Sequence, residues 1–420
     1  MSLSGSQKFA MLLCKFADST TVEPHPTSYY QDLIERAGTG GLADYWKAAS
    51  LNHIDLGGSM VYGWKVLTST HDQYVAAHPS RWEKILGAIA AFPEVNVSGY
   101  TGVVAVFNRD IGDSGAAGAG VLCGPEDTNV TFLAHETGHV FGLQHSFDTS
   151  SRMDVSWSAP GEYYDLHDIM SAMNVYMDRT SAFGMAGPLL AAPNLDRLGW
   201  LDPSRVWTPP LTGSSSQSQL DLVSLDSPGF PGYIAAKIGT LYVEFRTVDG
   251  WDKAIPRPAV LIHFLRDPNA VVLASDPVKY VNDWQPGQTY GPSPIRAAIF
   301  HGGTWVHVES FNMQARTARI TITHQTRPIS MLDRIFEGAA QIVLSQAQDG
   351  GGWIVLASGR IIPVAPRSPV LEVLDKLAIA AETEALSVEA RRSVERTVFA
   401  DLANLLERFI EPHSSGKGGG

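Results

Sequence analysis

Three histidines and a glutamate stand at spacings that suit metal chemistry. Residues 132–146 read FLAHETGHVFGLQHS and include His135, Glu136, His139, Gly142 and His145. On a helix, residues four positions apart project from one face, one turn from each other. The neutral imidazoles of His135 and His139 can therefore bind one Zn²⁺ ion, and Glu136 falls beside that ion as a general base.

The glycine in this stretch indicates how a third ligand reaches the same ion. Gly142 tolerates a positive φ, so we expect the helix to end or turn sharply there. Such a bend would let His145 return to the metal from outside the helix. Three protein ligands leave the fourth tetrahedral position for water, which is the arrangement of a catalytic zinc site rather than a structural one.

The full spacing H-E-x-x-H-x-x-G-x-x-H resembles the signature of the metzincin clan of zinc peptidases. A bare H-E-x-x-H also occurs by chance in helices that bind nothing, whereas the extended form requires five residues at set offsets. The resemblance implies that His135, His139 and His145 bind Zn²⁺. It also implies that Glu136 is the catalytic base.

A methionine downstream of the motif extends the resemblance. Metzincins place a methionine-containing turn under the zinc, and residues 168–171, Asp-Ile-Met-Ser, resemble that turn. Met170 is therefore expected to lie under the metal, although an isolated methionine can also be core filler. His167 is not expected to bind the ion, because three histidines already complete the site. Three nearby tyrosines could stabilise an oxyanion or serve in ordinary packing: Tyr163, Tyr164 and Tyr176.

The segments before the motif alternate between strands and helices. Strands are expected at 9–16, 53–56, 61–67, 102–107 and 121–123, and helices at 28–37, 41–50 and 80–92. The glycine- and alanine-rich residues 112–120 indicate a loop, and 121–123 a short edge strand that an extended substrate could join. The zinc helix is expected to begin near residues 126–127. This alternation predicts an α/β (α+β) catalytic domain with a mixed sheet and an active-site helix, as in metzincins.

Composition and further resemblances divide the chain into regions. Residues 52–64 and the Leu-Gly-Trp string within 194–201 resemble gametolysin-like and immune-inhibitor-A-like secreted peptidases. Residues after 220 carry short strands with Pro/Gly turns, typical of a β-sandwich. The expected regions are a catalytic domain (1–207), a linker (208–219), a β-rich, sandwich-like domain (220–365), a C-terminal helical segment (366–413) and a flexible tail (414–420).

Composition narrows the classes of partner. The chain has 420 residues, of which 44% are hydrophobic and 18% charged, and a formal net charge of −12. That acidity argues against nucleic acid, since phosphate binding needs a basic surface. No apolar run reaches the ~20 residues that a membrane span needs. Cys14 and Cys123 are interpreted as buried free thiols, with a single disulfide as the alternative.

These features predict a zinc-dependent endopeptidase that acts on a protein or peptide substrate. The alternative is an inactive or structural zinc-binding module acting through its β-rich and helical C-terminal regions; the presence of Glu136 counts against it. The family resemblance implies secretion. Residues 9–16, however, are interpreted as a first strand with no small-residue cleavage site after it, so a cytoplasmic location stays open.

Overall fold

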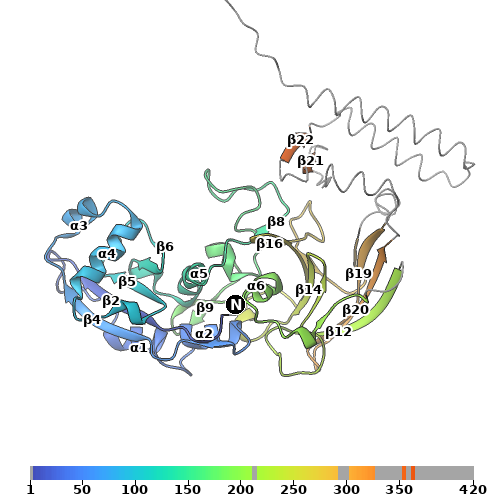
Figure 1. The fold of residues 1–420 in the computed structure, drawn as a ribbon, viewed down its shortest axis with the longest axis horizontal. Helices are drawn as coiled ribbons and strands as arrows, with labels where there is room; N and C mark the ends of the chain where they lie inside the picture. Colours follow the sequence, from blue (N-terminus) through green and yellow to red (C-terminus); the bar gives the residue numbers. More distant parts are fainter. Residues whose placement is uncertain (1–2, 211–214, 292–301, 327–351, 356–360, 365–420) are drawn as a thin grey trace, which may run out of the picture. The chain divides into compact units, whose positions relative to one another are not determined.

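The computed structural model describes residues 3–210, 215–291, 302–326, 352–355 and 361–364. Within them the chain is a mixed α/β protein with several sheets and few helices (Figure 1). The expected mixture of helices and sheets is confirmed at this level. The chain divides into two compact units: unit 1 is Met1–Pro209, Gln219–Gln288 and Val308–Ile320, and unit 2 is Pro210–Ser218, Thr289–His307 and Thr321–Gly420.

A five-stranded sheet forms the first part of unit 1, with strand order β4-β2-β5-β7-β6. Its first four strands are parallel and β6 is antiparallel. The strands are β2 (Phe9–Lys15), β4 (Met60–Val66), β5 (Gly102–Phe107), β6 (Gly115–Ala117) and β7 (Gly120–Cys123). Because side chains alternate along a strand, β2 sends Phe9, Met11 and Leu13 into one core and Leu12 and Cys14 into another.

Four helices accompany this sheet: α1 (Thr27–Ile34), α2 (Leu42–Ala49), α3 (His71–Ala77) and α4 (Arg81–Ala91). Helix α4 begins at Ser80, whose side chain accepts a hydrogen bond from Glu83 N in a capping box. It packs Ile85 into the core that also holds Leu12. Helix α5 (Val130–Val140) packs Leu133 into the opposite core, with Met11. The sheet thus lies between α4 and the helix that carries the histidines.

The expected strand at 121–123 is present as β7, but its expected place at the edge of the sheet was wrong, as was the expectation that all of 112–120 is a loop. Residues 115–117 form β6, which pairs with β7, so β6 is the edge and β7 lies inside the sheet. Gly118, with φ +55°, belongs to the tight turn between the two strands. A strand of glycine and alanine has no alternation of polar and apolar side chains, so its sequence pattern resembles a loop.

A second sheet joins residues from both sides of the expected linker. Its order is β11-β13-β14-β15-β16-β8, with β17 also paired to β15. The strands are β8 (Phe147–Asp148), β11 (Val206–Trp207), β13 (Ala235–Ile238), β14 (Leu241–Arg246), β15 (Ala259–Arg266), β16 (Asn269–Val272) and β17 (Asp283–Trp284). Strand β8, directly after the histidine motif, runs parallel to β16. The domain boundaries drawn from composition remain a prediction.

The remaining elements are shorter or lie further along the chain. A four-stranded sheet has the order β12-β20-β19-β18, with β12 (Ser215–Val223), β18 (Thr289–Tyr290), β19 (Gly302–Asn312) and β20 (Thr317–Thr326). Two-stranded pairs are β1 (Gly5–Ser6) with β3 (Ile54–Asp55), β9 (Asp178–Ser181) with β10 (Gly184–Ala186), and β21 (Gly352–Val355) with β22 (Ile361–Val364). Helix α6 spans Ala192–Arg197.

The expected C-terminal helical segment (366–413) and flexible tail (414–420) lie outside the described residues. Among the described residues, no helix combines the length and apolar character needed to cross a membrane.

Candidate metal centre

Helix α5 begins and ends where local chemistry favours it. The Asn129 side chain accepts a hydrogen bond from Phe132 N at 2.9 Å and caps the first turn. The expected start near 126–127 was early, because Pro125–Asp127 form a separate 3₁₀ turn. At the other end Gly142 has φ +90°, and its N–H donates to the His139 carbonyl at 2.9 Å. The expected turn at Gly142 is therefore present.

The turn brings three histidines together. One side-chain nitrogen from each of His135, His139 and His145 can be chosen so that all three lie within 4.8 Å of one another. The Nε2 atoms of His135 and His139 are 3.1 Å apart. The ring of His145 lies 4.8 Å from that of His139 and 5.5 Å from that of His135, between centroids. Nitrogens this close can share one ion.

The second ring nitrogen of each histidine contacts an acceptor. Nδ1 of His135 lies 2.9 Å from the Ile169 carbonyl, and Nδ1 of His139 lies 2.9 Å from the Leu143 carbonyl. Nδ1 of His145 lies 2.6 Å from the Glu162 carboxylate. An acceptor at Nδ1 favours the tautomer that leaves Nε2 with a lone pair. All three rings are thus oriented with Nε2 available to a metal.

The backbone amide of Ala172 adds a competing contact at the first histidine. Its nitrogen lies 3.1 Å from His135 Nδ1. The amide can donate only to an unprotonated Nδ1, whereas the Ile169 carbonyl accepts only from a protonated one. Ligation through Nε2 selects the protonated Nδ1, and therefore the bond to the Ile169 carbonyl.

Burial keeps His135 and His139 neutral, which is the ligating form. Loss of solvent is the main cause that lowers the pKa of His135 well below its ordinary value. Loss of solvent also lowers the pKa of His139 to about 4, against the opposing effect of the Leu143 carbonyl.

The glutamate of the motif is nearly enclosed. Glu136 is 9% exposed, and its Oε2 accepts a hydrogen bond from Ala116 N at 2.6 Å. Burial raises the pKa of Glu136 to about 7, while the Ala116 amide and the Arg81 guanidinium oppose the shift. The carbonyl oxygen of the same residue, Ala116, accepts a hydrogen bond from Arg81 Nη1 at 2.9 Å. Edge strand β6 therefore contacts the glutamate directly.

Met170 lies under helix α5 and is fully buried. A Cβ placed on Gly138 would lie 2.6 Å from Met170 Sδ, so the thioether fills the space beside that glycine. The Asp168 side chain accepts from Met170 N at 3.0 Å, and Ser146 N donates to the Met170 carbonyl at 3.0 Å. The turn is thus bonded to the residue that follows His145.

The neighbouring polar residues fall into separate environments. The Tyr163 ring lies 4.5 Å from the ring of His145, whereas Tyr176 packs against His167 at 5.1 Å. Tyr164 lies under the Arg152 guanidinium at 4.0 Å. Of these three tyrosines, Tyr163 is therefore the one whose ring packs against a histidine of the metal centre, His145.

Two other histidines lie outside this group. His167 is buried, and neither of its ring nitrogens has a hydrogen-bond partner among the residues that the structure describes. His263 is fully buried, and its Nε2 lies 2.9 Å from Asp165 Oδ2. The group of ligating atoms includes neither residue.

Sequence reasoning missed the partners that orient the site. Glu162 lies in an irregular loop with no spacing that relates it to His145. The Ile169 and Leu143 contacts use backbone carbonyls, which no side-chain pattern reports. The histidine, glycine and methionine pattern shows the ligands, whereas these supports depend on how distant segments pack.

The donor set fits a zinc ion. Three imidazole nitrogens suit zinc, copper, iron or nickel, and the hydrogen-bonded Nδ1 atoms supply the outer contacts that such ligands usually have.

The two cysteines lie in the five-stranded sheet, Cys14 in β2 and Cys123 in β7. Both are buried free thiols, so the interpretation of two free thiols is confirmed.

No family model, curated protein or solved structure matches this chain in the comparisons with known proteins.

Proposed function

We propose that this chain is a zinc-dependent endopeptidase of metzincin type. The observation that carries the proposal is the convergence of His135, His139 and His145, with their nitrogens within 4.8 Å of one another, beside a buried carboxylate at Glu136. A structural zinc site has no need of that carboxylate. The fold-level support is the edge strand β6 next to α5, and the turn around Met170 beneath α5.

His135, His139 and His145 would hold the ion through Nε2. A zinc ion held there would supply Lewis-acid chemistry, lowering the pKa of a water and polarising a substrate carbonyl. Glu136 accepts the proton of the attacking water and returns it to the leaving amine. Its burial excludes bulk water from the carboxylate, and the Ala116 amide orients it. The reaction is hydrolysis of an amide bond.

The edge strand supports an extended peptide as the substrate. Ala116 in β6 pairs with Val121 of β7, and its N–H and carbonyl are bonded to the Glu136 and Arg81 side chains. A peptide chain that paired with the open side of β6 would displace these two contacts and so pass beside Glu136. Backbone pairing of this kind favours a polypeptide over a small amide.

The test measures casein cleavage together with metal content. We expect about one zinc per chain, loss of cleavage after chelation and recovery when zinc is restored. Glu136→Gln keeps an acceptor for the Ala116 amide but cannot accept a proton. It should retain zinc and lower kcat by about 10²–10⁴-fold.

Three results would contradict the proposal. They are cleavage that resists chelation, full activity in Glu136→Gln, and a wild-type chain that takes up no zinc. Stable zinc binding without cleavage of any peptide would instead support the structural zinc-binding module. His135→Ala is the control for metal specificity, because it removes a ligand and should lower zinc content as well as activity.

A further inference from the structure

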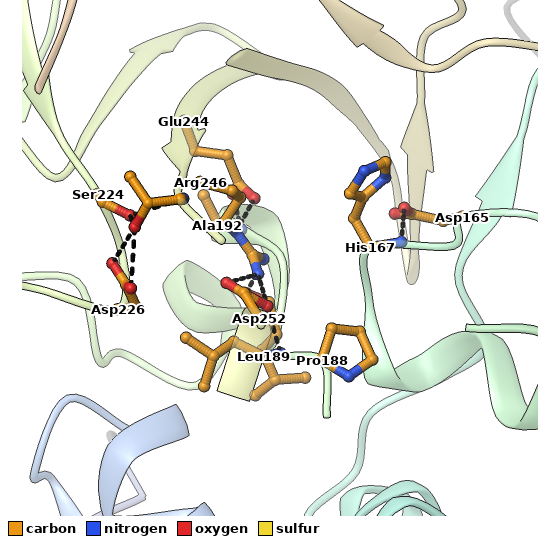
Figure 2. Close-up of polar contacts among 12 residues, drawn as sticks. Asp165, His167, Pro188, Leu189, Ala192, Ser224, Asp226, Glu244, Arg246 and Asp252 are labelled. Carbon is orange, nitrogen blue, oxygen red and sulfur yellow. Dashed lines mark hydrogen bonds and ion pairs between the residues drawn. The ribbon is translucent and has the colours of Figure 1, made fainter. Parts of the chain in front are cut away.

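A buried ionic group lies in unit 1, with no ligand of the metal centre among its members. Arg246, Glu244 and Asp252 are each fully buried. Arg246 Nε donates to Glu244 Oε1 at 2.9 Å, and Arg246 Nη1 donates to Asp252 Oδ2 at 2.8 Å (Figure 2). Removing three charges from water is costly unless each finds further partners. The location of those partners indicates what the group does.

All three side chains bond the backbone of one short segment, residues 189–192. Arg246 Nη2 donates to the Leu190 carbonyl at 2.6 Å, and Asp252 Oδ1 accepts from Leu189 N at 3.0 Å. Glu244 accepts from Ala192 N. Figure 2 shows the Arg246 guanidinium beside Asp252, close to Leu189 and Ala192. The charges therefore hold the path of the chain from Leu189 to the start of α6.

This segment in turn holds the turn beneath the metal centre. The Leu189 carbonyl accepts from Ile169 N at 3.2 Å. The Ile169 carbonyl is the acceptor at 2.9 Å for His135 Nδ1. One continuous series of bonds thus runs from Arg246 and Asp252 through Leu189 and Ile169 to His135.

Neighbouring contacts attach the same segment to other parts of the site. The Gly187 carbonyl accepts from Thr131 Oγ1 of helix α5 at 2.9 Å, and the Pro188 carbonyl accepts from the Tyr45 hydroxyl at 2.8 Å. In α6, Asn194 Nδ2 donates to Asp168 Oδ2 at 2.6 Å. Asp168 caps the turn that contains Met170. Residues 187–194 therefore lie between the ionic group and the metal centre.

We propose that Arg246, with Glu244 and Asp252, positions His135 for metal binding by holding residues 189–192 against Ile169. Arg246 is a positioning residue, and it touches neither metal nor substrate. The proposal rests on the proposed function only in taking zinc as the ion. It assigns to β14, which lies in the expected β-rich region, a part in orienting a ligand carried by helix α5.

The test compares Arg246→Lys with Ile85→Ala. Lysine keeps the charge but lacks the planar fork that reaches Glu244, Asp252 and Leu190 together. Ile85 is buried in the other core of the sheet, so Ile85→Ala lowers stability without touching this series of bonds. Zinc affinity is measured by competition with a chelator, at a temperature below the thermal unfolding midpoints of both variants. The ring nitrogens of His135 are observed by ¹⁵N NMR of the full-length chain with labelled histidine.

We expect Arg246→Lys to weaken zinc binding about tenfold and to shift the His135 Nδ1 signal. Ile85→Ala should change neither the zinc affinity nor the His135 signal, even if its thermal unfolding midpoint is equal to or lower than that of Arg246→Lys. Unchanged affinity and signal in Arg246→Lys, or equal losses in both variants, would overturn the proposal. If Arg246→Lys fails to fold, Asp252→Asn replaces it, since the amide keeps an acceptor for Leu189 N.

The two proposals fail differently in this design. A chain that binds zinc but cleaves nothing leaves the affinity comparison intact. A chain that binds no zinc contradicts the proposed function, while the NMR comparison of metal-free Arg246→Lys and wild type still decides whether Arg246 orients His135.

Discussion

The Nδ1 atom of His145 lies 2.6 Å from the Glu162 carboxylate, whereas the equivalent nitrogens of His135 and His139 contact backbone carbonyls. His145 is also the histidine that follows the helix rather than lying within it. Its ring lacks the support of helical neighbours, and the carboxylate supplies a charged partner in their place. The second oxygen of Glu162 accepts from Ala159 N at 2.7 Å, which ties the carboxylate to its own loop.

Glu162→Gln should weaken zinc binding by about 10–100-fold, the usual cost of losing an outer-shell partner of a metal ligand. The amide still accepts a hydrogen bond, but it lacks the charge that makes the imidazole a stronger donor to the metal. Competition with a chelator of known affinity measures the loss. Glu94→Gln is the matched control, because Glu94 forms an exposed pair with Lys65. Equal zinc affinity in Glu162→Gln and wild type would contradict the role given to Glu162.

A second relationship concerns Gly138 and Met170. Replacing glycine by alanine inside a helix ordinarily stabilises by about 1 kcal/mol. Here the new Cβ would lie 2.6 Å from a sulfur that is fully buried, and overpacking costs about 1–3 kcal/mol. We therefore expect Gly138→Ala to lower the free energy of unfolding by about 1 kcal/mol, measured by urea denaturation of the metal-free chain.

The same substitution in a Met170→Ala background provides the control. Met170→Ala alone opens a cavity at a cost of about 2–5 kcal/mol. With the sulfur gone, Gly138→Ala should become stabilising by up to about 1 kcal/mol, so its effect changes sign. An equal effect of Gly138→Ala in both backgrounds would show that the contact with Met170 does not govern this position.

Local chemistry explains which parts of the site the sequence predicts. The pair His135 and His139 depends on helical spacing, and the bend at Gly142 on the positive φ that glycine permits. Both are interactions between residues close in the chain, so the pattern contains them. The first strand and helix α4 were predictable for the same reason, through a continuous apolar run and a helical period.

The parts that were not predictable depend on distant segments. Strand β8 pairs with β16, more than a hundred residues later, and nothing in either short strand specifies the other. The edge strand β6 has only small side chains, so its pairing with β7 left no pattern. Arg246 bonds the backbone of Leu190, and a backbone carbonyl has no sequence signature. Such features arise from packing and require coordinates.

The third prediction concerns His167, which is buried and packs against Tyr176. Within the described part of the chain, neither of its ring nitrogens has a hydrogen-bond partner. Burial lowers the pKa of His167 to about 4, against the opposing charge of Asp165. The folded chain therefore keeps this ring neutral while the unfolded chain takes up a proton near pH 6.5. Stability from His167 is complete above pH 6.5 and is lost as the pH falls toward 4.

His167→Phe should remove this part of the acid sensitivity. Phenylalanine keeps an aromatic ring against Tyr176 and has no nitrogen to leave unpaired, so stability at pH 8 should change by less than about 1.5 kcal/mol. Between pH 6.5 and 4 the variant should gain up to about 3 kcal/mol relative to wild type, the free energy of a shift of this size. Urea midpoints of both chains at several pH values measure the difference. Parallel curves for the two chains would contradict a neutral, buried His167.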